Sequence, residues 1–162
     1  MKIYYQNMKS PVGILHLLAN DNCLLSVSLD TEWKMQNLKI KNFIRQKNKI
    51  LNKAQQQLQE YFSHKRIKFD LPLQLEGTEF QLRAWRALNK IPYGKTISYS
   101  EQAKMIQKPK AVRAIGRTNG KNPFCIVIPC HRVIGKSGNL TGYAGGVEIK
   151  KYLLELEQSQ SK

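Results

Sequence analysis

The chain has 162 residues, of which 41% are hydrophobic, enough for one globular domain or two small ones with a buried core. It contains no apolar stretch long enough to cross a bilayer, and its first residues lack the layout of a secretory signal. Lys and Arg total 27 against 11 Asp and Glu, a net charge of +16. The absence of a membrane span and of a secretory signal predicts a cytoplasmic protein with no membrane contact. The positive charge predicts either a nucleic-acid partner or, if the basic surface is only solvated, no polyanionic partner at all.

The three cysteines are Cys23, Cys125 and Cys130. An odd number excludes a closed disulfide framework and favours free thiols in a reducing compartment. The histidines are scattered and no CxxC pair occurs, so we expect neither a metal nor another cofactor.

The first half of the chain has the pattern of an α/β unit over residues 1–72. Short strands are predicted at 14–19 and 23–29, on either side of an Asn-Asp-Asn turn. Strict alternation in the second strand would place Cys23 in the core. Apolar residues at helical spacing predict an amphipathic helix over 49–63.

The second half carries two helix-start signals. Thr78 with Gln81 and Ser98 with Glu101 each form a predicted capping box. Pro109 suits the first turn of a third helix. Two short helices joined by a tight turn are typical of a helix-turn-helix, which binds DNA through its second helix. The basic residues of that helix are Lys110, Arg113 and Arg117.

A candidate nucleophile follows this helix pair. The composition of residues 124–128 predicts a buried strand, which would place Cys125 in the core and Cys130 at the strand end beside His131. A thiol reacts as the thiolate, which a basic, partly exposed site with a nearby histidine favours. Since neighbours in a strand point to opposite faces, His131 would reach the sulfur only through a bend at Pro129 or a bridging water. The alternative is a buried cysteine beside a surface histidine.

The remainder of the chain is predicted as a glycine-rich loop over 135–146 and a C-terminal helix. The loop lacks the GxxxxGK[ST] order of a phosphate-binding loop. The expected apolar stripe of the helix is Ile149, Tyr152, Leu153 and Leu156.

Taken together, these motifs resemble the O6-alkylguanine-DNA alkyltransferases (methylated-DNA–protein-cysteine methyltransferases). The resemblance covers nearly the whole chain and is strongest over residues 77–157. The resemblance implies an α/β (α+β) protein with a small RNase H-like sheet domain at 1–72. A winged-helix-like domain with the helix-turn-helix would occupy 73–162. The matching segments include Gly77-Thr78-Glu79-Phe80-Gln81, Ile91-Pro92-Tyr93-Gly94, Arg113-Ala114-Ile115-Gly116, Asn122-Pro123, Ile128-Pro129-Cys130-His131-Arg132-Val133-Ile134 and Gly142-Tyr143-Ala144-Gly145-Gly146.

The resemblance also implies roles for individual residues. Cys130 would take the alkyl group from guanine O6 and keep it, so that each molecule acts once. His131 would act as the base through a bridging water, and Glu157 would orient its imidazole. Tyr99 would donate a hydrogen bond to guanine N3, and Arg113 would enter the base stack as the lesion flips out. The remaining implied site residues are Asn122 at the turn, Ala114 on the DNA-binding helix, and Val133, Tyr143 and Ala144 at the base pocket.

The sequence therefore predicts a monomeric repair protein for O6-alkylguanine in double-stranded DNA, and leaves open whether O4-alkylthymine is a second substrate. The zinc-binding domain of the adaptive-response relatives is not expected. One alternative is a non-catalytic module that binds alkylated bases, in which Trp replaces the nucleophile, and the presence of Cys130 argues against it. The other is a helix-turn-helix regulator, which would need dimeric half-sites.

Overall fold

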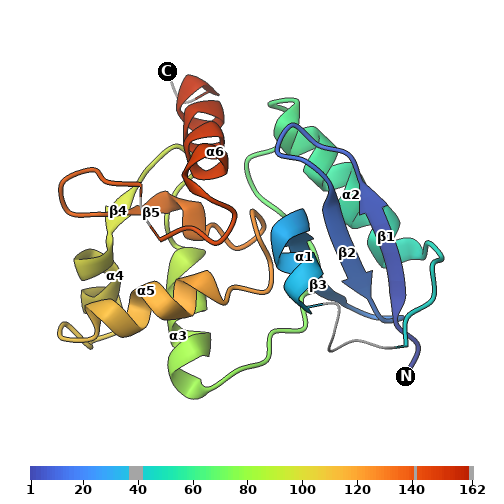
Figure 1. The fold of residues 1–162 in the computed structure, drawn as a ribbon, viewed down its shortest axis with the longest axis horizontal. Helices are drawn as coiled ribbons and strands as arrows, with labels where there is room; N and C mark the ends of the chain where they lie inside the picture. Colours follow the sequence, from blue (N-terminus) through green and yellow to red (C-terminus); the bar gives the residue numbers. More distant parts are fainter. Residues whose placement is uncertain (37–41, 141, 161–162) are drawn as a thin grey trace. The chain divides into compact units, whose positions relative to one another are not determined.

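The computed structural model describes residues 1–36, 42–140 and 142–160, and the chain forms two compact units (Figure 1). The first comprises Met1–Leu75 together with Pro123–Val127, and the second comprises Glu76–Asn122 and Ile128–Lys162. The mixed α/β fold class expected from the sequence is confirmed. Among the described residues, no helix is both long and apolar enough to span a bilayer.

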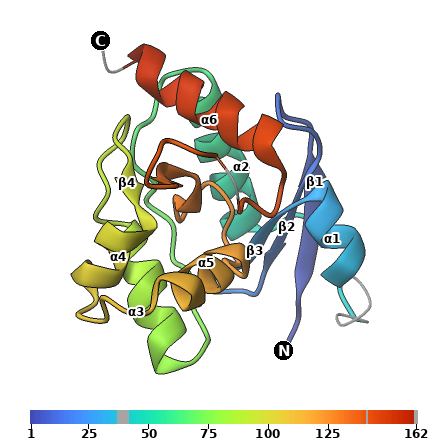
Figure 2. The same ribbon diagram turned by 60° about the vertical axis from the view of Figure 1, so that its left-hand side comes forward.

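The first unit is built on an antiparallel sheet of β1 (Tyr4–Met8), β2 (Leu15–Ala19) and β3 (Leu24–Leu29). All five residues of the central strand β2 are buried, because α2 (Lys49–Phe62) and α1 (Asp30–Gln36) cover opposite faces of the sheet, as Figures 1 and 2 show. The predicted strands and the helix near 49–63 are confirmed. Strand β1 and helix α1 were not predicted.

The prediction that Cys23 belongs to the core is wrong, because its side chain is only half-buried. The cause is a β-bulge, which pairs Leu18 with Ser26 but Ala19 with Leu24. This extra residue in β3 moves the core-facing position to Leu24. Cys23 is left at the turn, where its N–H donates to Asn20 Oδ1 at 2.7 Å.

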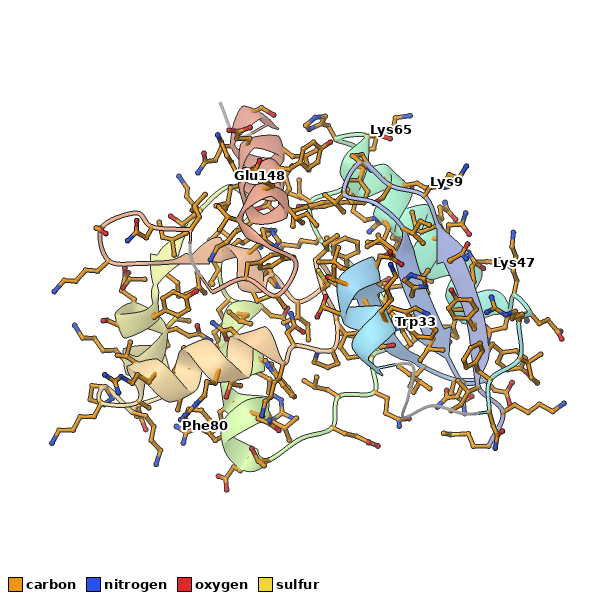
Figure 3. The ribbon with its side chains drawn as sticks, viewed as in Figure 1. Lys9, Trp33, Lys47, Lys65, Phe80 and Glu148 are labelled. Atoms are coloured by element: carbon orange, nitrogen blue, oxygen red, sulfur yellow. The ribbon has the colours of Figure 1, made fainter. Side chains whose placement is uncertain are left out.

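The ends of this unit are set by local hydrogen bonds. Helix α2 begins after Asn48, whose side-chain oxygen accepts the Leu51 N–H at 2.9 Å. Beyond Pro72 the chain still runs along β3, since the Pro72 carbonyl accepts the Leu24 N–H at 2.7 Å and the Gln74 N–H donates to Leu24 O at 3.0 Å. The first unit therefore continues to Leu75. In Figure 3, Lys9, Lys47 and Lys65 point outward from this unit, whereas Trp33 packs into it, stacked on Tyr5 and His16.

The second unit contains α3 (Glu79–Leu88), α4 (Tyr99–Met105) and α5 (Val112–Gly120) around a small apolar cluster. Both predicted capping boxes are present, at Thr78 with Gln81 and at Ser98 with Glu101. Helix α5 starts later than predicted. Pro109 lies in a turn closed by the Ala111 N–H on Lys108 O at 2.9 Å.

Two short strands and a last helix complete this unit. Strand β4 (Ile97–Ser98) pairs in parallel with β5 (Val133–Ile134), and α6 (Val147–Gln160) follows the glycine-rich loop.

The predicted strand over residues 124–128 is wrong, although its side chains are buried as expected. Only Phe124 forms a bridge, to Val27 of the first unit. The chain then reverses in a γ-turn centred on Ile126, with φ of 73° and the Val127 N–H on Cys125 O at 2.8 Å. A β-branched residue at positive φ is strained, and buried neighbours hold it there. Apolar composition therefore signalled burial here but not backbone conformation. Because of the bridge to Val27, Pro123–Val127 joins the first unit and not the expected 73–162 domain.

Candidate active site

The backbone before Cys130 is shaped by two hydrogen bonds to a single carbonyl. Pro129 has φ −82° and ψ 67°, and the Cys130 N–H donates to Ile128 O at 2.8 Å, which is the geometry of an inverse γ-turn. The same oxygen accepts Asn122 Nδ2 at 2.7 Å. Cys130 thus begins a 3₁₀ turn, η1 (Cys130–Arg132), and does not end a strand. The side chain of Asn122 holds the peptide that precedes the half-buried thiol.

Next to the thiol lies a buried cluster of three side chains. Helix α6 supplies Glu157 and η1 supplies His131 and Arg132. His131 Nε2 and Glu157 Oε2 are 2.6 Å apart, and both side chains are fully buried. Arg132 donates to the same carboxylate from Nε at 2.8 Å and from Nη2 at 3.1 Å. A bidentate ion pair of this kind fixes the orientation of the carboxylate and favours its ionised form.

The hydrogen-bond pattern assigns the protonation state of His131. Since the Glu157 carboxylate only accepts, Nε2 carries the hydrogen and Nδ1 keeps its lone pair. Nδ1 is buried and bonds to no atom of the residues that the structure describes. Burial lowers the pKa of His131, the Arg132 and Lys150 cations lower it further, and Glu157 opposes the change. A neutral imidazole with Nδ1 available can act as a base.

Glu157 is ionised in this setting. Burial by itself would raise the pKa of the carboxyl, but the hydrogen bond from His131 and the pairing with Arg132 outweigh burial and bring the pKa down to about 2. Its negative charge balances the buried Arg132 cation, which also donates from Nη1 to Ile91 O at 2.7 Å.

Lys150 and Arg132 are site residues that the sequence reasoning missed. Lys150 is fully buried, and its Nζ donates to Val133 O at 2.5 Å and lies 3.5 Å from the Tyr99 hydroxyl. Burial raises the pKa of Tyr99, and a negative charge on Cys130 raises it further. Burial lowers the pKa of Lys150, and the same thiolate charge opposes this. Both side chains therefore lie close enough to the sulfur for its charge to shift their pKa values.

The buried face of α6 differs from the predicted apolar stripe. Tyr152 is 36% exposed, whereas Lys150 and Glu157, two helical turns apart, are fully buried. This spacing was the available signal, since residues two turns apart share one face of a helix. The apolar residues buried on α6 are Leu153, Leu154 and Leu156.

The structure gathers only part of the predicted site around the thiol. Of the residues assigned to DNA, Arg113 and Arg117 of α5 are exposed and Ala114 is half-buried. Lys110 is also exposed, but its predicted place in the helix is wrong, because it lies in the turn before α5. The loop before α6 carries half-buried Tyr143 and exposed Ala144. This loop closely approaches Tyr99 at Gly142 (φ 83°), where an added Cβ would lie 3.0 Å from the Tyr99 hydroxyl. The residues gathered near the thiol are Asn122, His131, Glu157, Tyr99 and Val133.

Comparison with known families covers both units. The model of the 6-O-methylguanine DNA methyltransferase ribonuclease-like domain matches residues 3–75. The model of the DNA binding domain of the same protein matches residues 79–159.

Individual relatives extend over nearly the whole chain. A methylated-DNA–protein-cysteine methyltransferase of Methanosarcina barkeri is 45% identical over 157 residues, 97% of this chain and 98% of the relative. The constitutive one of Bacillus subtilis is 42% identical over 161 residues, 98% of each chain.

Two crystal structures from Mycobacterium tuberculosis share the fold. The O6-methylguanine methyltransferase is 41% identical with a TM-score of 0.85, covering 99% of this chain and 95% of that one. OGT in complex with DNA is 42% identical with a TM-score of 0.87, covering 97% and 94%. The resemblance inferred from the motifs is thereby confirmed, and the chain belongs to the 6-O-methylguanine DNA methyltransferase family.

Proposed function

We propose that this protein repairs O6-alkylguanine in double-stranded DNA by irreversible transfer of the alkyl group to the sulfur of Cys130. The observation that carries the proposal is the fixed imidazole next to the thiol. Glu157 holds His131 Nε2 at 2.6 Å, which leaves the buried Nδ1 as a proton acceptor. The names of the relatives, methylated-DNA–protein-cysteine methyltransferases, support the reaction type.

In the proposed reaction, His131 Nδ1 takes the Cys130 proton through a bridging water. The thiolate attacks the alkyl carbon in line with the bond to guanine O6. A sulfur–carbon bond forms as the carbon–oxygen bond breaks, and the electron pair stays with the purine. Tyr99, kept protonated by the raised pKa of its hydroxyl, donates a hydrogen bond to N3 and stabilises that charge. The thioether has no route back to a thiol, so each monomer acts once.

We propose α5 as the recognition helix. The exposed Arg113 and Arg117 of α5, and the exposed Lys110 in the turn before it, are suited to phosphate contacts. Arg113 would enter the base stack when the base flips out. The DNA complex of the Mycobacterium tuberculosis relative supports this partner. Ala114 would lie against the groove, and the Val133 carbonyl, Tyr143 and Ala144 would contact the flipped base. Val133 O already accepts Lys150 Nζ, and its second lone pair is the one that would read the base.

Two substitutions separate base flipping from chemistry. Arg113→Ala should slow repair of duplex DNA by about 10- to 100-fold, because unstacking a base costs a few kcal/mol. It should leave the reaction with a free O6-alkylguanine base nearly unchanged, since a free base needs no flipping. Tyr99→Phe should slow both reactions, because the lost hydrogen bond acts on the leaving purine itself. Single-turnover rates of both variants on both substrates give the comparison.

Circular dichroism should first confirm that both variants are folded, and the wild-type protein must accept the free base for the comparison to hold. Equal losses on duplex and free base for Arg113→Ala would contradict the flipping role and assign the residue to the pocket or the fold.

DNA affinity should fall steeply with salt and depend little on the unmodified sequence. Each phosphate neutralised by a Lys or Arg contributes a slope of roughly −0.9 to the plot of log affinity against log salt. We therefore expect a steep negative slope for this chain of net charge +16, measurable by fluorescence anisotropy with two unrelated duplexes. A flat plot, or strong preference for one undamaged duplex, would favour the regulator alternative.

A further inference from the structure

A pair of buried amides joins the helices of the helix-turn-helix. Gln102 of α4 is fully buried and Asn119 of α5 is 5% exposed. Gln102 Nε2 donates to Asn119 Oδ1 at 3.0 Å, and Asn119 Nδ2 donates to Gln102 Oε1 at 2.7 Å. Buried amides are costly unless they are bonded. This reciprocal pairing closes at only one register of the two helices, unlike an apolar contact, which tolerates sliding.

The same pair is anchored to helix α3. Gln102 Nε2 also donates to Ala84 O at 3.1 Å. Immediately beside this bond, Trp85 Nε1 donates to Thr118 O at 2.9 Å. The C-terminal end of α5 is therefore tied to α3 and α4 at two successive residues. The N-terminal end of α5 follows Ala111, which makes no side-chain cap hydrogen bond, and the N-terminal half of the helix packs through the apolar Val112 and Ile115. The side-chain hydrogen bonds that tie α5 to α3 and α4 are therefore at its C-terminal end.

A chain of hydrogen bonds continues from this pair to the nucleophile. The Asn119 carbonyl accepts the Asn122 N–H at 3.2 Å. Asn122 Nδ2 donates to Ile128 O at 2.7 Å, and that oxygen accepts the Cys130 N–H at 2.8 Å. A continuous chain of hydrogen bonds within the second unit thus connects the end of α5 to the peptide that carries the thiol.

We infer that Gln102 and Asn119 are a positioning pair that holds α5 at one register and so fixes the distance between its DNA-binding side chains and the Cys130 sulfur. The pair contacts neither DNA nor the alkyl group. The inference rests on the proposed function, because it matters only where a base held by α5 must reach the thiol. A shift of α5 would misplace the lesion while leaving the thiol chemistry intact.

The test is the double variant Gln102→Leu with Asn119→Leu. It removes both polar groups together, so neither amide is left buried and unpaired, and it changes the number of side-chain heavy atoms by only one. We expect a folded protein by circular dichroism, with Cys130 alkylated by iodoacetamide within about twofold of the wild-type rate. Alkyl transfer from methylated duplex should be slower by about tenfold or more, because a small misplacement of the reacting groups is costly in rate.

A matched control is Gln57→Leu in the first unit. Gln57 is also buried, at 4% exposure, and makes two hydrogen bonds to the backbone of Asp70, at 3.0 and 2.9 Å. It repeats one of the two substitutions, but outside the hydrogen-bonded chain from Gln102 to Cys130, so the rate on duplex should stay at the wild-type value well below the melting temperature. If the double variant does not fold, Asn119→Asp serves instead. It keeps the size and the acceptor of Asn119 but loses the donor to Gln102, and the same selective loss on duplex is expected.

Wild-type transfer from duplex by either variant would overturn the inference, and so would an equal loss in the duplex and iodoacetamide reactions. The inference would also be overturned if Gln57→Leu slowed transfer from duplex selectively, because removal of any buried amide would then produce the same effect. Failure of the proposed function looks different, since the wild-type protein itself would then take no alkyl group from methylated duplex.

Discussion

Replacement of Cys130 by serine is expected to abolish alkyl transfer and to leave binding to undamaged duplex within about twofold of wild type, because the phosphate contacts proposed above do not involve the thiol. A serine hydroxyl cannot be ionised by a neutral imidazole to a comparable extent, whereas a thiol beside His131 and Lys150 can. In the wild-type protein, peptide mass mapping after reaction with methylated duplex should find one methyl group per molecule, on Cys130.

The other two thiols provide the controls. Cys125 is 3% exposed and Cys23 is half-buried, so Cys125→Ala and Cys23→Ser should each retain single-equivalent transfer. Methylation on Cys125, or more than one methyl group transferred per molecule, would contradict the mechanism.

Glu157→Gln should be the most damaging change to stability within the site. It leaves the Arg132 guanidinium, 7% exposed, without its counter-charge and faces it with an amide NH₂. Breaking a buried pair in this way costs about 3–5 kcal/mol of unfolding free energy. Because His131 also loses its orienting acceptor, transfer should slow as well. Urea unfolding followed by circular dichroism measures the loss, and Glu155→Gln, an exposed position on the same helix, should change stability by less than about 0.5 kcal/mol.

The same carboxylate predicts how stability depends on pH. The pKa of Glu157 in the fold is about 2 against an ordinary value of 4.5, so the folded state binds the proton less readily than the unfolded state. Its contribution, roughly 3 kcal/mol, is fully present above the ordinary value and is lost as the pH falls from about 4.5 toward 2. Glu157→Gln should lack this part of the acid destabilisation. An identical pH profile for the variant and the wild type would contradict the assignment.

Features that depend on neighbouring residues could be predicted from the sequence, whereas features that depend on contacts between distant residues could not. The capping boxes at Thr78 and Ser98 are local, and both were predicted correctly. Cys130 was identified as the candidate thiol, but the strand predicted before it was wrong, because Phe124 bridges to Val27 of β3 and the chain then turns at Ile126. The bridge is a long-range contact that the local sequence does not show. Composition alone cannot distinguish a buried turn from a buried strand.

The charged residues of the site were hidden for a related reason. The spacing of Lys150 and Glu157 indicates a shared helix face but not the burial of that face, which comes from the packing of α6 against η1. Glu157 itself was named through the family resemblance, not through its pattern. Cys23 was misassigned because a single bulge in β3 changes which residues face the core, and a bulge leaves no clear mark in an alternating sequence.

The γ-turn segment has a consequence for protein engineering. Because Pro123–Val127 belongs to the first unit while the residues on both sides belong to the second, the polypeptide passes between the units three times, and no single cut separates them. A fragment of residues 76–162 would keep Phe124 and its apolar neighbours but lack the first unit that buries them. These side chains would be exposed to solvent, and the fragment would be prone to aggregation.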